Sequence, residues 1–286
     1  MKRSQASCVL LGFCLLVAVP AITRAQSTDP VKSLRLGTGY VHLRMLDRLV
    51  SPLPYQSNMV PISLAYQSRT ENGLFEVSLD LLPGMADNTG EFKDRAVVLS
   101  GYNGDGNITS SELALAPSFF GGDELTVKYL RRLNRPASSG VQLYAGAECK
   151  QFFYLSFPMV PILFHSELSL GPSLAADWQA VEGTTLRASA SLPLLSLITR
   201  LPYSTDPVDG EHGYLYVTYR TGSRLTSVHQ YQRVNLGLEF QKQMGDGWSL
   251  GAAYRFCWLG DSARPELHAY ANSILLHATI HLNPSR

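Results

Sequence analysis

The segment WSLGAAYRFCW, residues 248–258, contains the pattern that decides the fold. Apolar or aromatic residues occupy every second position from Trp248 to Trp258, and small or polar residues, including Arg255, occupy most positions between them. This period of two is that of a β-strand, because successive side chains of a strand point to opposite faces. About ten residues also suffice to cross a bilayer as a tilted strand. The segment therefore predicts a strand with one apolar face and aromatic residues at both ends.

The same alternation recurs in about ten segments, and an even number of strands lets a sheet close with its two ends side by side. Residues 214–219 also resemble a strand, which would form an external hairpin or raise the number of strands to about twelve. The segments are 248–258, 233–241, 273–282, 164–178, 185–194, 34–45, 60–70, 74–82, 124–133 and 141–151.

The connections between these segments alternate in length. The short ones are rich in glycine and asparagine, which tight hairpins need for positive φ. A single-chain outer-membrane barrel has short periplasmic turns and long external loops, and the order along this chain fits that arrangement. We expect short turns at 71–73, 134–140, 182–183 and 245–247, and long loops at 47–58, 83–122, 152–163, 198–230 and 260–266.

An apolar outer face implies closure, because hydrocarbon cannot satisfy the backbone groups of an open edge strand. In its pattern, though not in any specific motif, nearly the whole mature chain resembles the small outer-membrane β-barrel proteins of Gram-negative bacteria. The resemblance implies an all-β, closed, antiparallel up-and-down transmembrane barrel in the outer membrane, in contact with its lipid. The chain departs from this class in ending on residues 282–286 without a terminal aromatic residue. A soluble β-sandwich is the alternative, with its apolar face inward.

The N-terminus predicts export. Lys2 and Arg3 precede an apolar stretch at 9–20, and small residues follow at 23–25, as in a cleaved signal peptide. We therefore expect residues 1–25 to be removed and residues 26–286 to form a single barrel domain. Hydrophobic residues make up 45% of the chain, charged residues 16%, and the formal net charge is +1, which argues against disorder and against a nucleic-acid partner. The oligomeric state stays open.

The face opposite the apolar one carries both signs of charge. In a barrel of about ten strands these side chains would fill much of the lumen, either as an ion-paired plug or as a selective small pore. His277 and His281 would lie about 13 Å apart on one strand, too far for one metal ion. The lumen-facing candidates are Arg35, Glu76, Asp80, Lys128, Arg132, Glu148, Lys150, His165, Glu167, Asp177, Arg187, Arg233, Glu239, Arg255, His277 and His281.

A membrane-embedded hydrolase is a further alternative. His165 with Glu167 and Asp177 would supply acid and base groups, and outer-membrane phospholipases use a histidine close to a serine. Here Ser166 directly follows His165, so the two side chains would point to opposite faces of one strand. The omptin proteases use loop-borne acidic residues and histidine without a short signature. An enzyme is therefore less expected than a binding or structural barrel.

One segment has the spacing of a metal site. Residues 101–112 resemble an EF-hand calcium loop through Asn103, Asp105, Asn107 and Glu112, although Gly101 replaces the first acidic ligand. Any calcium affinity should therefore be weak. The alternative is an ordinary glycine-rich loop, and we expect no other cofactor.

Apolar residues are also concentrated in the connection expected at 152–163. They would form either a mouth that captures a hydrophobic molecule or an aromatic girdle at the membrane interface. The sequence thus favours a barrel that binds a small solute or allows its passive passage. With such a mouth, this solute could be hydrophobic. The alternatives are a structural, adhesin-like barrel that acts through its external loops and the hydrolase. The mouth candidates are Phe152, Phe153, Phe157, Met159 and Leu195.

Overall fold

The structure is a computed structural model, and its described part consists almost entirely of strands. The expected signal peptide, residues 1–25, lies outside the described part. Among the described residues, no helix has the length and apolar character needed to cross a membrane. The structure describes residues 31–48, 54–88, 96–102, 108–114, 118–134, 140–157, 164–200, 214–245, 247–262 and 266–282.

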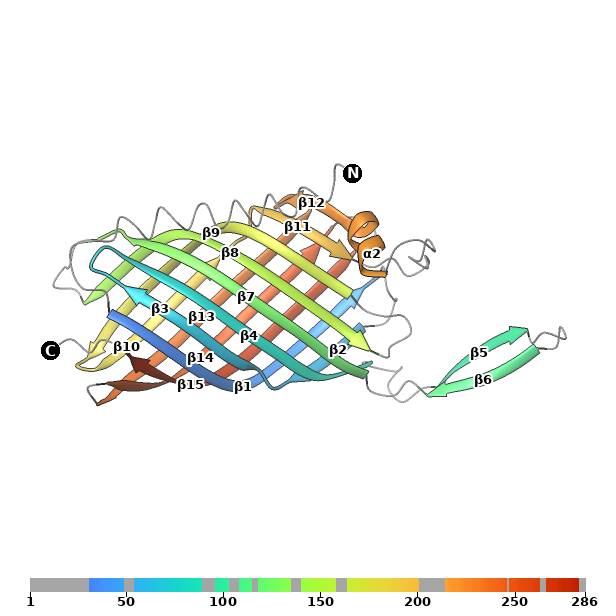
Figure 1. Ribbon diagram of the computed structural model, residues 1–286, viewed down its shortest axis with the longest axis horizontal. Coiled ribbons are helices and arrows are strands. Elements are labelled where there is room, and N and C mark those ends of the chain that lie inside the picture. Colours follow the sequence, from blue (N-terminus) through green and yellow to red (C-terminus); the bar gives the residue numbers. More distant parts are fainter. Residues whose placement is uncertain are drawn as a thin grey trace.

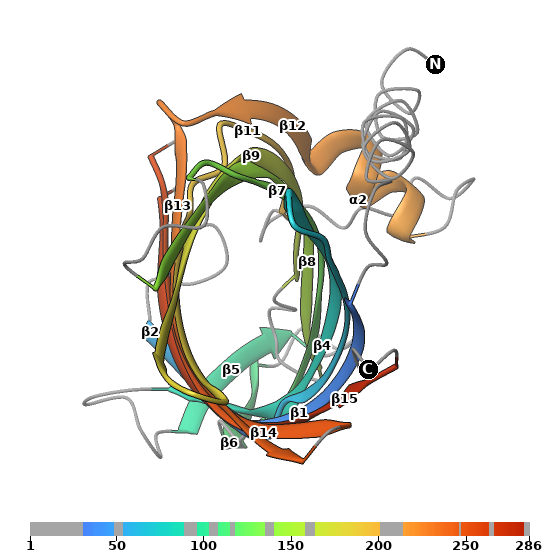
Figure 2. The ribbon, with the colours of Figure 1, turned by 90° about the vertical axis from the view of Figure 1, so that its left-hand side faces the viewer.

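The strands form one closed antiparallel wall (Figures 1 and 2). Strands that neighbour each other in the wall pair antiparallel, and the first pairs with the last from Ser33↔His281 to Asp47↔Leu267. The wall strands are β1 (Val31–Asp47), β2 (Pro54–Met59), β3 (Ile62–Arg69), β4 (Gly73–Asn88), β7 (Ser118–Arg132), β8 (Val141–Phe157), β9 (Phe164–Val181), β10 (Thr184–Ser191), β11 (Leu195–Arg200), β12 (Ser223–Ser227), β13 (Tyr231–Gly245), β14 (Trp248–Asp261) and β15 (Leu267–His281).

These thirteen segments make a ten-stranded barrel, because three of its strands are interrupted. β2 and β3 both lie between β1 and β4, and Pro61 separates them. β10 and β11 both pair with β9, and Pro193 separates them. Proline has no N–H to donate, so it ends regular pairing at these points. β12 and β13 follow the same side of β11 and β10, with residues 228–230 between them. The prediction of a closed, up-and-down barrel of about ten strands is confirmed.

The prediction for residues 214–219 is wrong: they belong to the helix α2 (Tyr214–Gly222), not to a strand. The barrel therefore does not gain two more strands. Figure 2 shows α2 outside the barrel wall. Tyr219 of this helix packs edge-on against Phe164, with ring centroids 5.9 Å apart, and thereby joins α2 to the start of β9.

The strands are longer than expected, so several predicted loop boundaries are wrong. β4 continues to Asn88, and β8 continues to Phe157. The predicted loop at 83–122 also contains the hairpin of β5 (Ala96–Tyr102) and β6 (Ile108–Ala114), which forms a separate two-stranded sheet. In Figure 1 this hairpin projects beyond the barrel at the end where α2 lies. We call this the loop end, and the end with the short hairpins the turn end.

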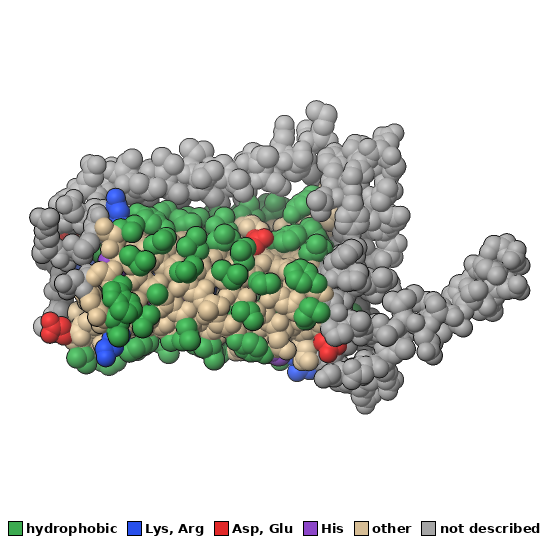
Figure 3. All heavy atoms as spheres, turned by 60° about the horizontal axis from the view of Figure 1, so that its bottom comes forward, with side chains coloured by type: hydrophobic (Ala, Val, Ile, Leu, Met, Phe, Trp, Pro, Cys, Tyr) green, Lys and Arg blue, Asp and Glu red, His purple; other side chains and the backbone are tan. Residues whose placement is uncertain are grey.

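The outer face of the wall is apolar (Figure 3). Leu276 is 63% exposed, Leu238 48% and Trp248 45%, although all three lie in the middle or at the start of paired strands. In water, a large continuous apolar surface of this kind would be unfavourable, whereas in a bilayer it matches the solvent. The face opposite, which points into the barrel, carries the charged residues described below. The wall is thus apolar outside and carries its charged side chains inside, the reverse of a soluble β-sandwich.

Candidate functional site in the barrel lumen

The lumen contains a cavity of about 200 Å³. Apolar side chains line one part of this cavity, and charged side chains line the other. The alternation of β1 shows how the sequence makes both: Arg35 points inward near the turn end, and Val41, Leu43 and Met45 point inward further toward the loop end. The loop-end part of the lumen is therefore apolar. We call it the apolar layer, and it consists of Val41, Leu43, Met45, Met59, Ala86, Phe120, Tyr154, Ile198, Tyr231, Leu259, Leu267 and Ala269, with Leu82, Phe152 and Ala271 packed against them.

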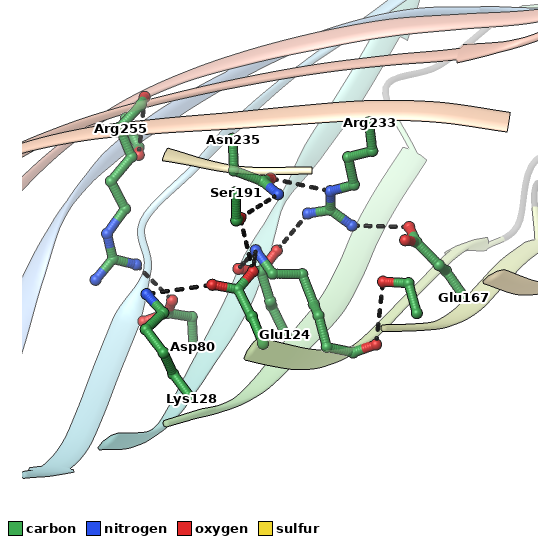
Figure 4. A network of polar contacts seen from close by, with 12 residues as sticks. Asp80, Glu124, Lys128, Glu167, Ser191, Arg233, Asn235 and Arg255 are labelled. Carbon is green, nitrogen blue, oxygen red and sulfur yellow. Dashed lines mark hydrogen bonds and ion pairs between the residues drawn. The ribbon is translucent and has the colours of Figure 1, made fainter. Parts of the chain in front are cut away.

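Between the apolar layer and the turn end, charged residues from most of the strands form a lumen ion-pair network, part of which is drawn in Figure 4. Its members come from strands far apart in sequence and point toward the barrel interior. Several of them also line the cavity. The network consists of Arg35, Arg69, Glu76, Asp80, Glu124, Lys128, Glu148, Lys150, Glu167, Asp177, Arg187, Arg233, Glu239 and Arg255.

Arg233 is the most extensively bound side chain of the network. Its guanidinium donates to Glu167 at 2.8 Å and to Glu124 at 2.6 Å, and Glu124 also accepts from Lys150 at 2.9 Å. The guanidinium lies 4.8 Å from the centre of the Phe152 ring, a cation–π arrangement. These contacts neutralise and satisfy charges that would otherwise be costly to bury.

Two further groups of ion pairs belong to the network. Arg35 bridges Glu76 at 3.3 Å and Glu239 at 2.8 Å, and it thereby joins three strands of the wall. Asp177 accepts from Arg187 at 2.6 Å and from Arg69 at 2.8 Å, near the turn end. Because most members have more than one partner, the network holds the strands together across the lumen rather than forming isolated pairs.

A separate polar cluster lies at the loop end of the apolar layer. Arg200 of β11 binds both Asp47 and Asp261, which are the last residues of β1 and β14, and Arg224 also binds Asp261. Both aspartates are fully buried. The apolar layer is thus bounded by charges on both sides along the barrel axis.

Sequence reasoning missed several of these residues. Glu124 has the same strand parity as Lys128, so alternation could have indicated that it points inward. Asp47 and Asp261 were assigned to loops because each stands at a strand end. Arg69 and Arg200 also lie at strand ends, where a strand's extent is hardest to predict from sequence.

The remaining lumen-facing candidates have varied surroundings. His165 is fully buried and stacks on Tyr154, with ring centroids 5.2 Å apart. His277 lies 3.6 Å from Glu239. Arg132 and His281 lie at the turn end and do not line the cavity.

Four of the five mouth candidates lie in strands and not in loops. Phe152 lines the lumen cavity, and Phe153, which has the opposite parity, packs edge-on against Phe164. Phe157 is the last residue of β8, and Met159 lies outside the described residues. Leu195 pairs with Leu170 in β9, whose strand parity places it on the outer face. These four residues therefore lie in strands rather than in the expected loop, and a hydrophobic mouth stays a prediction.

The calcium-loop candidates fall partly outside the described residues, namely Asn103, Asp105 and Asn107. Glu112 lies in β6, where its backbone pairs with Val98 of β5. Among the described residues, no group of three or more His, Cys, Asp and Glu side chains could hold a metal ion. The calcium site stays a prediction.

The geometry around His165 differs from that of a nucleophile with its base. Ser166 lies beside it but has the opposite strand parity, and its hydroxyl is 3.2 Å from that of Tyr219 in the outer helix α2. His165 instead lies against the rings of Tyr154 and Tyr231 in the lumen. The side chains of His165 and Ser166 are therefore on opposite faces of the wall.

The closed wall and its apolar outer face define the chain as an outer-membrane β-barrel protein. No family model matches the sequence, and no curated protein matches it either. The fold is similar to that of outer membrane protease OmpT from Escherichia coli, at 8% identity and a TM-score of 0.47, covering 90% of this chain and 100% of that one.

Two other solved structures show the same general likeness. The translocator domain of the autotransporter NalP from Neisseria meningitidis has 12% identity and a TM-score of 0.40, with 98% of each chain covered. The Pseudomonas putida toluene transporter TodX has 8% identity and a TM-score of 0.31, with 90% of each chain covered. At these identities the likeness concerns the barrel fold alone.

Proposed function

We propose that this outer-membrane barrel binds a small, largely apolar solute inside its lumen. The observation that carries this proposal is the cavity of about 200 Å³ between the apolar layer and the lumen ion-pair network. An apolar cavity of roughly 150 Å³ is large enough to hold benzene. The solute would therefore have the size of a single substituted ring or a short alkyl chain.

Binding fits the lumen better than free passage does. The ion pairs cross the barrel interior, and Tyr154 and Phe120 stack at 5.3 Å within the apolar layer. A continuous water-filled pore would require many of these contacts to be absent. Solute would then enter and leave through thermal opening of the loop end rather than through a permanent channel.

The direct test is calorimetric titration of the refolded full chain in nanodiscs with benzyl alcohol, a small neutral aromatic solute, after subtraction of empty nanodiscs. Saturable binding with about one solute per barrel is expected. Ala271, which lines the cavity, offers a way to fill it: Ala271→Leu should abolish binding. Ala278→Leu, at an exposed outward position of the same strand, is the matched control and should bind as the wild type does.

Heat-modifiable gel mobility would show that both variants form folded barrels. Absence of saturable binding to the folded wild type would contradict the proposal. Equal binding by the two variants would place the bound solute outside the lumen cavity.

A structural or adhesin-like role is the second candidate. It is favoured by the β5–β6 hairpin, which pairs with no other described strand and projects beyond the barrel (Figure 1). Replacing residues 96–114 by a short glycine-serine linker should leave the gel mobility shift unchanged and abolish binding to host cells or matrix proteins. Retained binding would exclude the hairpin as the adhesive element.

We also propose that residues 1–25 are a signal peptide that directs export of the chain and is cleaved after residue 25. The supporting pattern is Lys2 and Arg3 before the apolar stretch at 9–20. The intact mass of the protein from outer-membrane fractions should correspond to a chain starting at Gln26. A chain that keeps residues 1–25 would contradict this.

A further inference from the structure

We infer that the solute carries one negative charge, a carboxylate that binds Arg255, while its apolar part lies in the apolar layer. This inference rests on the proposed function, because it names the class of solute for the same cavity. Arg255 projects from the middle of β14 and lines the cavity. The argument depends on how this side chain differs from the other basic groups there.

Arg255 is the most accessible of the described basic side chains that line the cavity. Its side chain is 35% exposed, compared with 17% for Lys128 and 12% for Arg187. Since Arg255 points into the barrel, this exposed surface faces the lumen. The other three basic groups of the cavity wall are less exposed still, namely Arg35 at 11%, Lys150 at 8% and Arg233 at 3%.

Arg255 is also lightly bound. Its Nη1 donates to Asp80 Oδ2 at 2.7 Å, and Asp80 is the one described residue to which its guanidinium makes a hydrogen bond. Arg233, by contrast, binds two carboxylates. A guanidinium offers five N–H donors in a planar fork that matches a carboxylate, so Arg255 retains donors for a second acceptor.

In the Arg255–Asp80 pair, the side chain that is accessible from the cavity is that of Arg255. Asp80 is 6% exposed, and its second oxygen, Oδ1, is buried without a hydrogen-bond partner in the described part of the chain. A cationic solute could not reach this oxygen without displacing the wall. Glu124 and Glu239 also line the cavity but are 19% and 18% exposed, compared with 35% for Arg255. The most accessible charged side chain of the cavity is therefore positive, which favours an anion over an amine of the same size.

Because Arg255 lies beside apolar side chains, the site favours an amphipathic solute. Leu259 lies four residues beyond Arg255 toward the loop end, on the same face of β14, with Cys257 between them. Leu82 lies two residues beyond Asp80 on the same face of β4. A carboxylate at Arg255 therefore places an attached ring or alkyl chain against apolar side chains. Benzoate and hexanoate have this form and size.

The test compares three solutes of similar shape, benzoate, benzamide and benzylamine, by calorimetric titration of the full chain in nanodiscs at neutral pH. Benzoate should bind about tenfold or more tightly than benzamide, and benzylamine should bind most weakly. Arg255→Gln should remove the preference for benzoate over benzamide. Asp80→Asn removes the competing carboxylate and should strengthen benzoate binding several-fold.

A matched control is Arg48→Gln, which removes a basic side chain that is 59% exposed at the loop end and should leave the preference unchanged. Gel mobility would verify folding of each variant. Equal affinities for benzoate and benzamide, or tightest binding of benzylamine, would overturn this inference but leave the proposed function standing. If none of the three solutes binds, the proposed function itself fails.

Discussion

Arg233 of β13 and Glu167 of β9 form a 2.8 Å ion pair that spans the strand made of β10 and β11. Glu167 is fully buried, and the Arg233 side chain is 3% exposed. Glu167 also accepts a 2.5 Å hydrogen bond from the hydroxyl of Tyr231. The pair lies where the apolar layer meets the lumen ion-pair network, so its loss would affect both.

Glu167→Ala should lower the free energy of unfolding by about 3–5 kcal/mol, because it leaves a buried guanidinium with one fewer partner. Reversible urea unfolding in lipid vesicles would measure this. The matched control is Glu266→Ala, which breaks an exposed pair with Arg48 and should cost about 0–1 kcal/mol. Equal effects of the two substitutions would contradict a tightly packed lumen.

Arginine at the middle of the outer face should destabilise the barrel in a depth-dependent manner. Leu238→Arg and Leu276→Arg are each expected to lower the free energy of unfolding by about 2–4 kcal/mol in vesicles, because both positions face hydrocarbon. Met244, which is 49% exposed near the turn end of β13, provides the control, and Met244→Arg should cost about 0–1 kcal/mol. Tolerance of arginine at both central positions would contradict the lipid-facing assignment.

The wild-type barrel should show no steady conductance in planar bilayers, because the apolar layer and the ion pairs occupy the lumen. Tyr154→Ala removes a ring that stacks on Phe120 and should produce transient openings. Tyr254→Ala removes an outward-facing tyrosine, 45% exposed, and should behave as the wild type does. A steady open current through the wild type would favour passage over binding.

Close approach of strands β1 and β15 requires glycine at position 39. A Cβ at Gly39 would lie 1.9 Å from the carbonyl oxygen of Ile274, which is far inside van der Waals contact. Gly39→Ala should therefore lower the free energy of unfolding by about 1–3 kcal/mol in urea titrations. A Cβ at Gly247 meets nothing within 4 Å, so Gly247→Ala should have a much smaller effect. Comparable losses would mean that the strand contact is not the cause.

Sequence and structure agree best where one face of a strand meets lipid. At 248–258 the apolar positions must alternate strictly, because every outward side chain has the same solvent. The prediction was weakest at 152–157, where both faces are apolar: Phe152 faces the apolar layer and Phe153 packs against Phe164 on the outer side. Period two disappears from the sequence there, although the strand continues.

The helix α2 was missed for a different reason. Its tyrosines, valine and threonines have high intrinsic strand propensity, and local propensity is readily overridden by tertiary contacts. Contacts of Tyr219 with Phe164 and Ser166 are of this kind. They join segments separated by 53 residues in the chain, so no local pattern could have indicated them.

The sequence by itself determined the strands, their two faces and the closure of the wall, because alternation is a local property and lipid imposes the same requirement on every strand. Tertiary structure alone decided which charges pair and where the cavity lies. Arg233 and Glu124 are 109 residues apart and meet only because the closed, staggered wall aligns β13 with β7 across the lumen. The accessibility of Arg255 arises in the same way, from what the opposite strands leave unfilled.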